Sequence, residues 1–455
     1  MAKIKSAFFC QSCGHESPKW LGKCPGCGAW NSFTEEIVEK TLSTGISSAS
    51  GKRDPRPVPY LEAAEEKSEG ARIATGNELD RVLGGGIVPG SVILLGGEPG
   101  IGKSTLLLQT ALNIPGKQIL YVSGEESEQQ VGLRARRMAA TNTQCDILTE
   151  TKLEVILRIA EKTKPHLLIV DSIQTMYTGL IDSSAGSVSQ IRECTGQLLR
   201  FAKQSGIPVI LVGHVTKDGQ IAGPKLLEHM VDVVLQFEGD RHHLFRIVRA
   251  LKNRFGATTE IGIYEMRNHG LAEVENPSGM LMSQRDEQLS GTVTGVVTEG
   301  VRPLLLETQA LVSSAVYGTP QRSATGFDLR RLHMLLAVLE KRCGFRLGVS
   351  DVFLNLTGGI RIEDPALDLA VVSAILSSAE DAPVDPGICF SAEVGLTGEI
   401  RPVQRIEQRI AEAEKLGFHT LYTSAYNLRG LDLGRMKIKV VGLQRMEHLY
   451  REIFG

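Results

Sequence analysis

The chain has 455 residues, of which 42% are hydrophobic, 22% charged and 5% aromatic, a composition that excludes disorder along most of its length. The 50 Lys and Arg residues against 52 Asp and Glu residues leave a net charge of −2, which excludes a uniformly basic nucleic-acid coat but not a local basic groove. The sequence shows no signal peptide and no apolar run near the roughly 20 residues that cross a bilayer. We therefore expect a cytoplasmic protein of about three domains.

Residues 1–35 predict a zinc module. Two Cys-x2-Cys pairs aim their thiolates at one point and together complete a tetrahedral sulfur shell, with the ligands Cys10, Cys13, Cys24 and Cys27. Gly14 and Gly28 follow the second cysteine of each pair, where the turn requires tolerance of a positive φ. The alternative is a pair of disulfides or unrelated thiols, which a reducing compartment disfavours.

The only two tryptophans of the chain, Trp20 and Trp30, lie in this module. We expect them to cap a core that is too small to fold without metal. The alternative is that they stack on nucleobases. Residues 36–70 are small, polar and Pro-rich without periodicity, which predicts a flexible linker.

Residues 71–285 predict a nucleotide-binding domain. An apolar strand at 91–95 leads into a Gly-x4-Gly-Lys-Ser loop, and a helical pattern follows at 106–112. Backbone N–H groups of such a loop cradle phosphates. The predicted ATP-binding residues are Gly97, Glu98, Pro99, Gly100, Ile101, Gly102, Lys103, Ser104 and Thr105. Lys103 is expected to reach the β and γ phosphates as a catalytic residue, and Ser104 to bind Mg²⁺.

Two further apolar strands end next to carboxylates. Asp171 closes the strand at 167–171, where it is expected to hold Mg²⁺ with Ser104, the alternative being a turn residue. Glu125 follows the strand at 118–123 and is the expected catalytic group that orients or deprotonates water, ahead of its neighbour Glu126. The alternative for both glutamates is favourable charge at the start of the next helix.

Several motifs together resemble known ATPases. The segment Leu83-Gly-Gly-Gly-Ile-Val-Pro-Gly90, the phosphate loop, Ser123-Gly-Glu-Glu-Ser127 and the strand at 167–171 resemble the RecA-type ATPases. With the zinc module and Lys252-Asn-Arg-Phe-Gly256, the whole chain resembles the bacterial RadA/Sms family of DNA-repair proteins. The resemblance implies ATP, Mg²⁺ and Zn²⁺ as cofactors, and DNA, RecA recombinase and a homo-hexamer as partners.

The pentapeptide is the most specific mark of this resemblance, and its residues are Lys252, Asn253, Arg254, Phe255 and Gly256. It follows an alternating strand at 243–251, so that its two cations project on the same side. The resemblance implies that Lys252 and Arg254 are catalytic and enter the ATP site of a neighbouring subunit. The alternative is an ordinary basic strand end.

One strand end and two loops are further candidates. The strand at 207–212 precedes His214, which is expected to sense the γ-phosphate. By resemblance, the loops at 174–189 and 217–228 face a central channel and grip DNA, the second through Lys217 and Lys225. The alternative is that both are plain surface loops.

In residues 286–455 apolar and polar residues alternate, which predicts strands, and helices are predicted near 365–379 and 403–416. This region resembles the proteolytic domain of Lon proteases. The nucleophile motif of that domain, Asp-Gly-Pro-Ser-Ala-Gly, is replaced here by Glu363-Asp-Pro-Ala-Leu-Asp368. Ala366 has no hydroxyl, and residues 403–409 contain no Lys. We expect a scaffolding domain without peptidase activity, with Arg361, Arg401 and Arg405 as candidate DNA contacts.

The expected fold class is α/β: a RecA-like P-loop ATPase core with a small N-terminal zinc ribbon and a C-terminal Lon-protease-like α/β domain. The leading hypothesis is a DNA-dependent ATPase of homologous recombination and repair, acting as a ring-forming helicase or translocase in branch migration beside RecA. The alternative is an ATP-switched DNA-binding adaptor without translocation, which the sequence does not separate from the first. An ATP-dependent Lon-type protease is the least favoured hypothesis.

Overall fold

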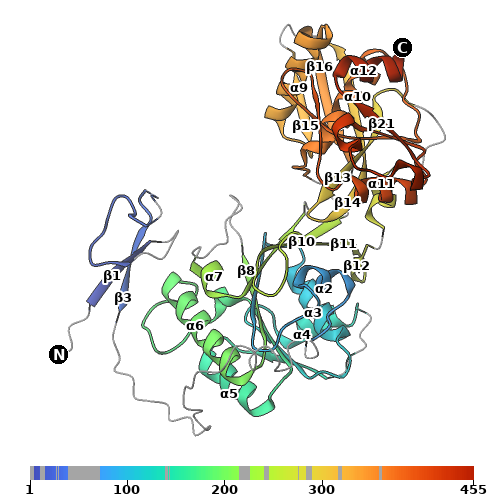
Figure 1. Cartoon of the computed structure of the whole chain (residues 1–455). Helices are drawn as coiled ribbons and strands as arrows, with labels where there is room; N and C mark the ends of the chain where they lie inside the picture. The colour runs from blue at the N-terminus through green and yellow to red at the C-terminus, as the bar shows by residue number, and fades with distance from the viewer. Residues whose placement is uncertain are drawn as a thin grey trace. The chain divides into compact units, whose positions relative to one another are not determined.

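The computed structural model describes residues 5–10, 16–26, 28, 30–38, 72–138, 142, 144–214, 226–239, 245–274, 276–282, 289–315, 320–357 and 361–455 (Figure 1). The chain divides into two compact units, one of residues 1–241 with 245–273 and the other of residues 242–244 with 274–455. In the described ranges, none of the helices combines the length and hydropathy that a bilayer-spanning helix requires. The domain limits given above stay predictions.

The N-terminal module is a small antiparallel sheet. Its strand order is β2 (Glu16–Ser17), β1 (Lys5–Cys10) and β3 (Phe33–Val38). The buried residues between the strands and the cysteine turn are Cys10, Cys24 and Phe33, with Phe8 and Leu21 packed against them. A core of this size supplies little hydrophobic stabilisation, so a module of this kind depends on an additional cross-link such as a metal.

The larger part of the first unit is a nine-stranded sheet. Its order is β12 (Gly270–Glu273), β11 (Ile261–Arg267), β10 (Phe245–Asn253), β9 (Val233–Glu238), β4 (Val92–Gly97), β8 (Val209–His214), β7 (Leu167–Asp171), β5 (Ile119–Ser123) and β6 (Cys145–Thr149). The six strands from β9 to β6 are parallel, and β10 to β12 continue the sheet antiparallel.

Helices cover both faces of this sheet (Figure 1). They are α2 (Asn77–Leu83), α3 (Lys103–Asn113), α4 (Glu128–Ala135), α5 (Leu153–Thr163), α6 (Val188–Ser205) and α7 (Leu226–Met230). On β4, Ile93 and Leu95 belong to the core beneath α3, whereas Val92 and Leu94 belong to the core beneath α6. Because both faces are covered, strands β4, β5 and β7 are buried along their whole length.

The predicted strands of this unit are confirmed. Strands β4, β5, β7, β8 and β10 begin and end within two residues of the expected limits. Continuous apolar runs are the signature of buried parallel strands, which explains the agreement. One feature was not predicted: the pairing of β10 with β9 shifts register between Ala250 and Lys252, so Leu251 is an extra, exposed residue in a β-bulge.

The second unit is built on a seven-stranded mixed sheet. Its order is β15 (Arg322–Thr325), β16 (Ser350–Leu356), β14 (Arg302–Ser314), β13 (Thr292–Glu299), β17 (Ile388–Ser391), β20 (Thr420–Ser424) and β21 (Lys439–Leu443). Strands β18 (Glu393–Val394) and β19 (Ile400–Arg401) pair separately. The helices are α8 (Pro277–Leu281), α9 (Leu329–Cys343), α10 (Asp368–Ala379), α11 (Ile406–Lys415) and α12 (Met446–Phe454).

Helices α10 and α11 pack on opposite faces of strand β13. Gly295 faces α10, because a Cβ on this glycine would lie 3.1 Å from the Cβ of Ala370. The next residue, Val296, belongs to the core that contains Ile406 and Ile410 of α11. The two predicted helices near 365–379 and 403–416 are thereby confirmed. Each begins about three residues later than expected. A 3₁₀ turn (Pro365–Leu367) precedes α10, and residues 403–405 precede α11 outside the helix.

Candidate functional site

The glycine loop lies at the carboxyl edge of the parallel strands. It follows β4, which ends at Gly97, and leads into α3, which begins at Lys103. Gly100 and Gly102 have φ angles of 77° and 114°, which side-chain-bearing residues rarely adopt. A Cβ on Gly97 would lie 2.6 Å from the carbonyl oxygen of Phe237. The glycines thus let the loop fold tightly against the sheet, with the N-terminus of α3 behind it, an arrangement that binds phosphates.

The side chain of Lys103 is buried at the base of this loop. Its Nζ donates hydrogen bonds to the carbonyl oxygens of Gly97 at 2.7 Å and Glu98 at 2.8 Å. Burial lowers the pKa of Lys103 to about 8, although the carboxylates of Asp171 and Glu125 oppose that change. The ammonium group therefore lies within the loop, between the backbone and the acidic ends of the neighbouring strands, as a phosphate-binding lysine requires.

Asp171 ends β7 and is 6% exposed. The hydroxyl of Tyr121, on the adjacent strand β5, donates a 2.5 Å hydrogen bond to its Oδ2. Burial raises the pKa of Tyr121 well above its usual range, so this group stays a neutral donor. Ser104, half-buried in the first turn of α3, and Asp171 supply hard oxygen donors, which is the chemistry that Mg²⁺ prefers. These two residues fit the predicted magnesium site.

The two glutamates after β5 have different partners. Glu125 accepts a 2.6 Å hydrogen bond from the hydroxyl of Ser172, which is fully buried. Glu126 forms an ion pair with Arg134 of α4 at 2.6 Å. A surface cavity of about 250 Å³, at the carboxyl ends of β5 and β6, is lined by both carboxylates. Of the two glutamates, Glu125 is the one whose carboxylate is hydrogen-bonded to the residue that follows β7.

Two residues of the site, Tyr121 and Ser172, were not predicted from the sequence. Tyr121 lies in an otherwise aliphatic strand, and Ser172 directly follows the strand carboxylate. The available signal was one hydroxyl within the strand at 119–123 and another directly after the strand at 167–171, but nothing in the sequence shows which hydroxyl reaches which carboxylate.

The segment 174–189 begins directly beside the site and is anchored at its start. The hydroxyl of Thr175 donates to the carbonyl oxygen of Ser172 at 2.8 Å. The amide of Thr178 donates to the fully buried Gln190 of α6 at 2.9 Å, and its hydroxyl donates to Glu154 of α5 at 2.6 Å. Hydrogen bonds therefore fix the first residues of this predicted loop to α5 and α6, two of the helices that cover the sheet.

The cations of the pentapeptide contact the turn between α7 and β9. The Nζ of Lys252 donates to the carbonyl oxygens of Glu228 and Val231, both at 2.8 Å. Arg254, which is half-exposed, forms an ion pair with Asp232 at 3.3 Å. Burial, with the charge of Arg254, lowers the pKa of Lys252. Both cations thus lie on one side of the strand end, bound to groups of their own chain.

The other three residues of the pentapeptide hold it against the end of α2. The side-chain amide of Asn253 donates to the carbonyl oxygen of Leu83 at 3.3 Å, and its oxygen accepts from the amide of Phe255 at 2.9 Å. A Cβ on Gly256 would lie 3.1 Å from the Cα of Gly84, so the two backbones approach closely. Asn253, Phe255 and Gly256 therefore fix the position of the motif, and Lys252 and Arg254 carry its charge.

Three predicted residues have little described structure. His214 is the last residue of β8 and the pairing partner of Gly97, but its side chain lies outside the described residues, as do Lys217 and Lys225 entirely. The backbone position of His214 is therefore beside the start of the glycine loop.

Two of the four predicted zinc ligands are described. Cys10 and Cys24 are 0% and 1% exposed and belong to the same small core. The amide of Gly28 donates to the carbonyl oxygen of Cys24 at 2.8 Å and its φ is 77°, which confirms the predicted turn at the second cysteine pair. Two buried sulfurs, one of them on such a turn, suit zinc. Cys13 and Cys27 lie outside the described residues, among which no three potential ligands converge.

The expectation for the tryptophans was wrong. Trp20 is 50% exposed and Trp30 70% exposed, so neither caps the core of the module. The interior between the strands and the cysteine turn is already filled by Phe8, Leu21 and Phe33. The core of the described module is therefore built from phenylalanine, leucine and cysteine side chains and not from the indoles.

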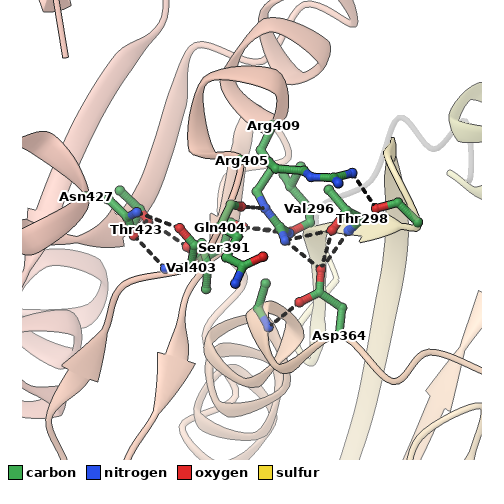
Figure 2. Close-up of polar contacts among 12 residues, drawn as sticks. Val296, Thr298, Asp364, Ser391, Val403, Gln404, Arg405, Arg409, Thr423 and Asn427 are labelled. Atoms are coloured by element: carbon green, nitrogen blue, oxygen red, sulfur yellow. Dashed lines mark hydrogen bonds and ion pairs between the residues drawn. The ribbon is translucent and has the colours of Figure 1, made fainter. Parts of the chain in front are cut away.

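The position of the Lon-type nucleophile in the second unit is fully buried. Ala366 is 0% exposed, and its amide donates to Oδ1 of Asp364 at 3.0 Å. Figure 2 shows the adjacent network, in which Arg409 donates to Asp364 at 2.7 Å, to the hydroxyl of Thr298 at 2.9 Å and to the carbonyl oxygen of Val296 at 2.9 Å. Arg409 is 2% exposed. The position of the nucleophile is therefore occupied by a buried alanine, and the neighbouring Asp364 forms an ion pair with the buried Arg409.

The three arginines considered as DNA contacts already have partners. Arg361 lies 3.6 Å from Glu363, and Arg401 lies 2.6 Å from Glu399. Arg405 donates to the carbonyl oxygen of Gly300 at 2.6 Å (Figure 2). The charges of Arg361 and Arg401 are thereby partly neutralised locally.

Three family models match the chain. A model described as a rubredoxin metal binding domain matches residues 8–35, an AAA domain matches residues 60–220, and a model described as subunit ChlI of Mg-chelatase matches residues 308–427. The matches agree with the zinc-ribbon, ATPase and Lon-like parts of the predicted fold class, which is confirmed.

Relatives of known name match over the full length. The DNA repair protein RadA of Bacillus subtilis is 50% identical over 461 aligned residues, covering 100% of both chains. That of Listeria monocytogenes is 48% identical over 449 residues, covering 98% of this chain and 97% of its own. Among solved structures, the RadB recombinase covers 45% of this chain and 100% of its own at 24% identity and a TM-score of 0.36. The chain therefore belongs to the RadA family of DNA repair proteins.

Proposed function

We propose that this protein is a DNA-dependent ATPase of homologous recombination and repair that forms a ring and moves on DNA, promoting branch migration beside RecA. The observation that carries the proposal is the grouping of Lys103, Asp171 and Glu125 at one edge of a parallel sheet, in a chain half identical to RadA over its whole length. The domain limits, with ATPase residues at 71–285, belong to the same proposal.

In this proposal the glycine loop and the start of α3 bind the phosphates of ATP. Lys103 holds the β and γ phosphates, and Ser104 and Asp171 hold Mg²⁺, which supplies charge stabilisation to the transferred phosphoryl group. Tyr121 keeps the Asp171 carboxylate in place by its hydrogen bond. Glu125 orients and deprotonates the attacking water. Its hydrogen bond from Ser172 supports this choice over Glu126, whose carboxylate is engaged by Arg134.

The pentapeptide cations complete the site of a neighbouring subunit in this proposal. In their own chain, Lys252 contacts backbone carbonyls and Arg254 contacts one carboxylate. The phosphates of a neighbouring ATP carry more charge than these partners and would attract both groups. His214, which pairs with Gly97, is the proposed sensor that reports the γ-phosphate to the segment after β8.

The segment 174–189 and the residues Lys217 and Lys225 are the proposed DNA contacts. The anchoring of Thr175 to the carbonyl oxygen of Ser172 supports a link between the first of these segments and Glu125. We further propose a cytoplasmic location, a hexamer, and one Zn²⁺ held by Cys10, Cys13, Cys24 and Cys27.

The test is strand displacement on forked DNA with and without ATP. We expect ATP-dependent displacement that is stimulated by RecA on recombination intermediates. Hydrolysis that DNA stimulates without any displacement would contradict translocation and favour the ATP-switched adaptor. The absence of DNA binding would contradict both functions.

Mixing variants tests the sharing of sites between subunits. Lys252→Ala and Arg254→Ala chains are expected to lose hydrolysis when alone, because their neighbours' sites lack the cations. Adding Lys103→Ala chains, which keep the cations, should restore part of the rate through mixed interfaces. ATPase rates across mixing ratios measure this, and a rate that never exceeds the sum of the separate rates would contradict the shared site.

A further inference from the structure

The zinc module exposes the only two tryptophans of the chain, at 50% for Trp20 and 70% for Trp30. Tryptophan is a highly buried residue type on average. The core of the module is formed without either ring, by Phe8, Leu21 and Phe33 together with two cysteines. The exposed indoles therefore contribute little to folding and are available to a ligand.

Both tryptophans are next to the same short segment, residues 22–23. Trp30 pairs with Lys23 in an antiparallel bridge, and the Lys23 ammonium lies 5.5 Å from the centre of its ring. The ring of Trp20 lies over Gly22, with two ring atoms 3.8 Å from the place that a Cβ would occupy. The carbonyl oxygen of Gly22 accepts a 2.8 Å hydrogen bond from the amide of Asn31. Backbone pairing thus places Lys23 opposite Trp30, and the ring of Trp20 packs on the adjoining Gly22.

We propose that Trp20, Lys23 and Trp30 form a stacking surface for the bases of single-stranded DNA. Stacking requires exposed aromatic surface, which the exposed fractions of both indoles provide, and a nearby cation for the phosphate backbone, which Lys23 provides. Because every base has a π-face, such a surface binds without reading the sequence. The inference rests on the proposed DNA function and adds a contact in the zinc module to it.

The size of the surface favours DNA bases over a protein partner. A stable protein interface buries about 800 Å² on each side and involves roughly 20–30 residues. In the described part of the module, Trp20 and Trp30 are the large hydrophobic side chains that are exposed. The surface consists of two rings and one lysine. Its size matches the area that one or two bases cover better than the area of a protein interface.

Tryptophan fluorescence of the full chain tests this directly, because these two residues are its only source. Titration with oligothymidylate is expected to quench the emission, and the single-tryptophan variants Trp20→Phe and Trp30→Phe separate the two rings. Anisotropy of a labelled oligothymidylate measures binding independently. Binding by anisotropy with unchanged emission from both rings would overturn the stacking surface.

Alanine and phenylalanine variants form the matched comparison. Trp20→Ala and Trp30→Ala are each expected to weaken oligothymidylate binding about tenfold, whereas the phenylalanine variants, which keep a ring, should lose much less. Zinc content verifies that each module is folded. Wild-type affinity in both alanine variants would overturn the inference, as would quenching by RecA alone and not by DNA. Failure of the wild-type chain to bind DNA at all would instead contradict the proposed function.

Discussion

Lys103→Ala is expected to lower the rate of ATP hydrolysis by a hundredfold or more, about the loss found when a charge-stabilising group is removed from an active site. The side chain is 4% exposed, and its ammonium lies within the glycine loop beside Gly97 and Glu98. Among the described residues no other cation donates to these two carbonyl oxygens. In the variant we therefore expect no neighbouring side chain to take over the role of the Lys103 ammonium. Steady-state hydrolysis, measured with and without DNA, gives the rate.

The control is Lys162→Ala, which removes an exposed lysine from α5 in the same unit. It should hydrolyse ATP at the wild-type rate. Normal turnover by the Lys103 variant would refute the phosphate-loop assignment. A loss of folding, visible as a lowered melting temperature, is not expected, because removing a buried ammonium also removes its desolvation cost.

Arg409→Ala is expected to have the largest effect on stability, lowering the free energy of unfolding of the second unit by about 3–5 kcal/mol. Arg409 is 2% exposed and joins α11 to Asp364, Thr298 and Val296 (Figure 2). Truncation leaves the Asp364 carboxylate without its cation. Hydrogen exchange of the full chain measures the effect, and protection of α11 and β13 should fall by roughly a hundred- to a few thousandfold.

Two further variants make this experiment decisive. Arg361→Ala removes an arginine that is 74% exposed beside an exposed glutamate, and it should change protection little. The double variant Asp364→Asn with Arg409→Met removes both charges, so it should regain much of the stability lost by the single variant. Equal loss in the single and double variants would show that packing, rather than the unpaired charge, causes the effect.

The motifs that carry the chemistry were readable from the sequence because each is contiguous in the chain. Within each of these motifs the functional residues are only a few positions apart. The local backbone geometry therefore fixes where they lie relative to one another. This applies to the glycine loop, the cysteine pairs and the pentapeptide. The strands around them were predicted for the same reason, since a parallel strand covered on both faces must be apolar throughout. The resemblance to the RadA/Sms family, confirmed by full-length relatives, rested on these segments.

Pairings between distant residues could not be read in this way. The hydrogen bond from Ser172 to Glu125 and that from Tyr121 to Asp171 join residues about 50 positions apart, which lie in or just after the neighbouring strands β5 and β7. They depend on the strand order, which places β5 next to β7. The carbonyl partners of Lys252 likewise depend on a bulge at Leu251, which no sequence pattern signalled.

The sequence by itself thus determined the α/β class, the phosphate loop, the cysteine pairs and the family of the chain. Only the tertiary structure decided that Glu125 and not Glu126 faces Ser172, that the indoles of Trp20 and Trp30 are exposed, and that Arg409 is buried against Asp364. The physical reason is that residue types and their spacing restrict local backbone geometry. Burial and ion pairing, in contrast, depend on which distant segments the packing of the sheets brings together.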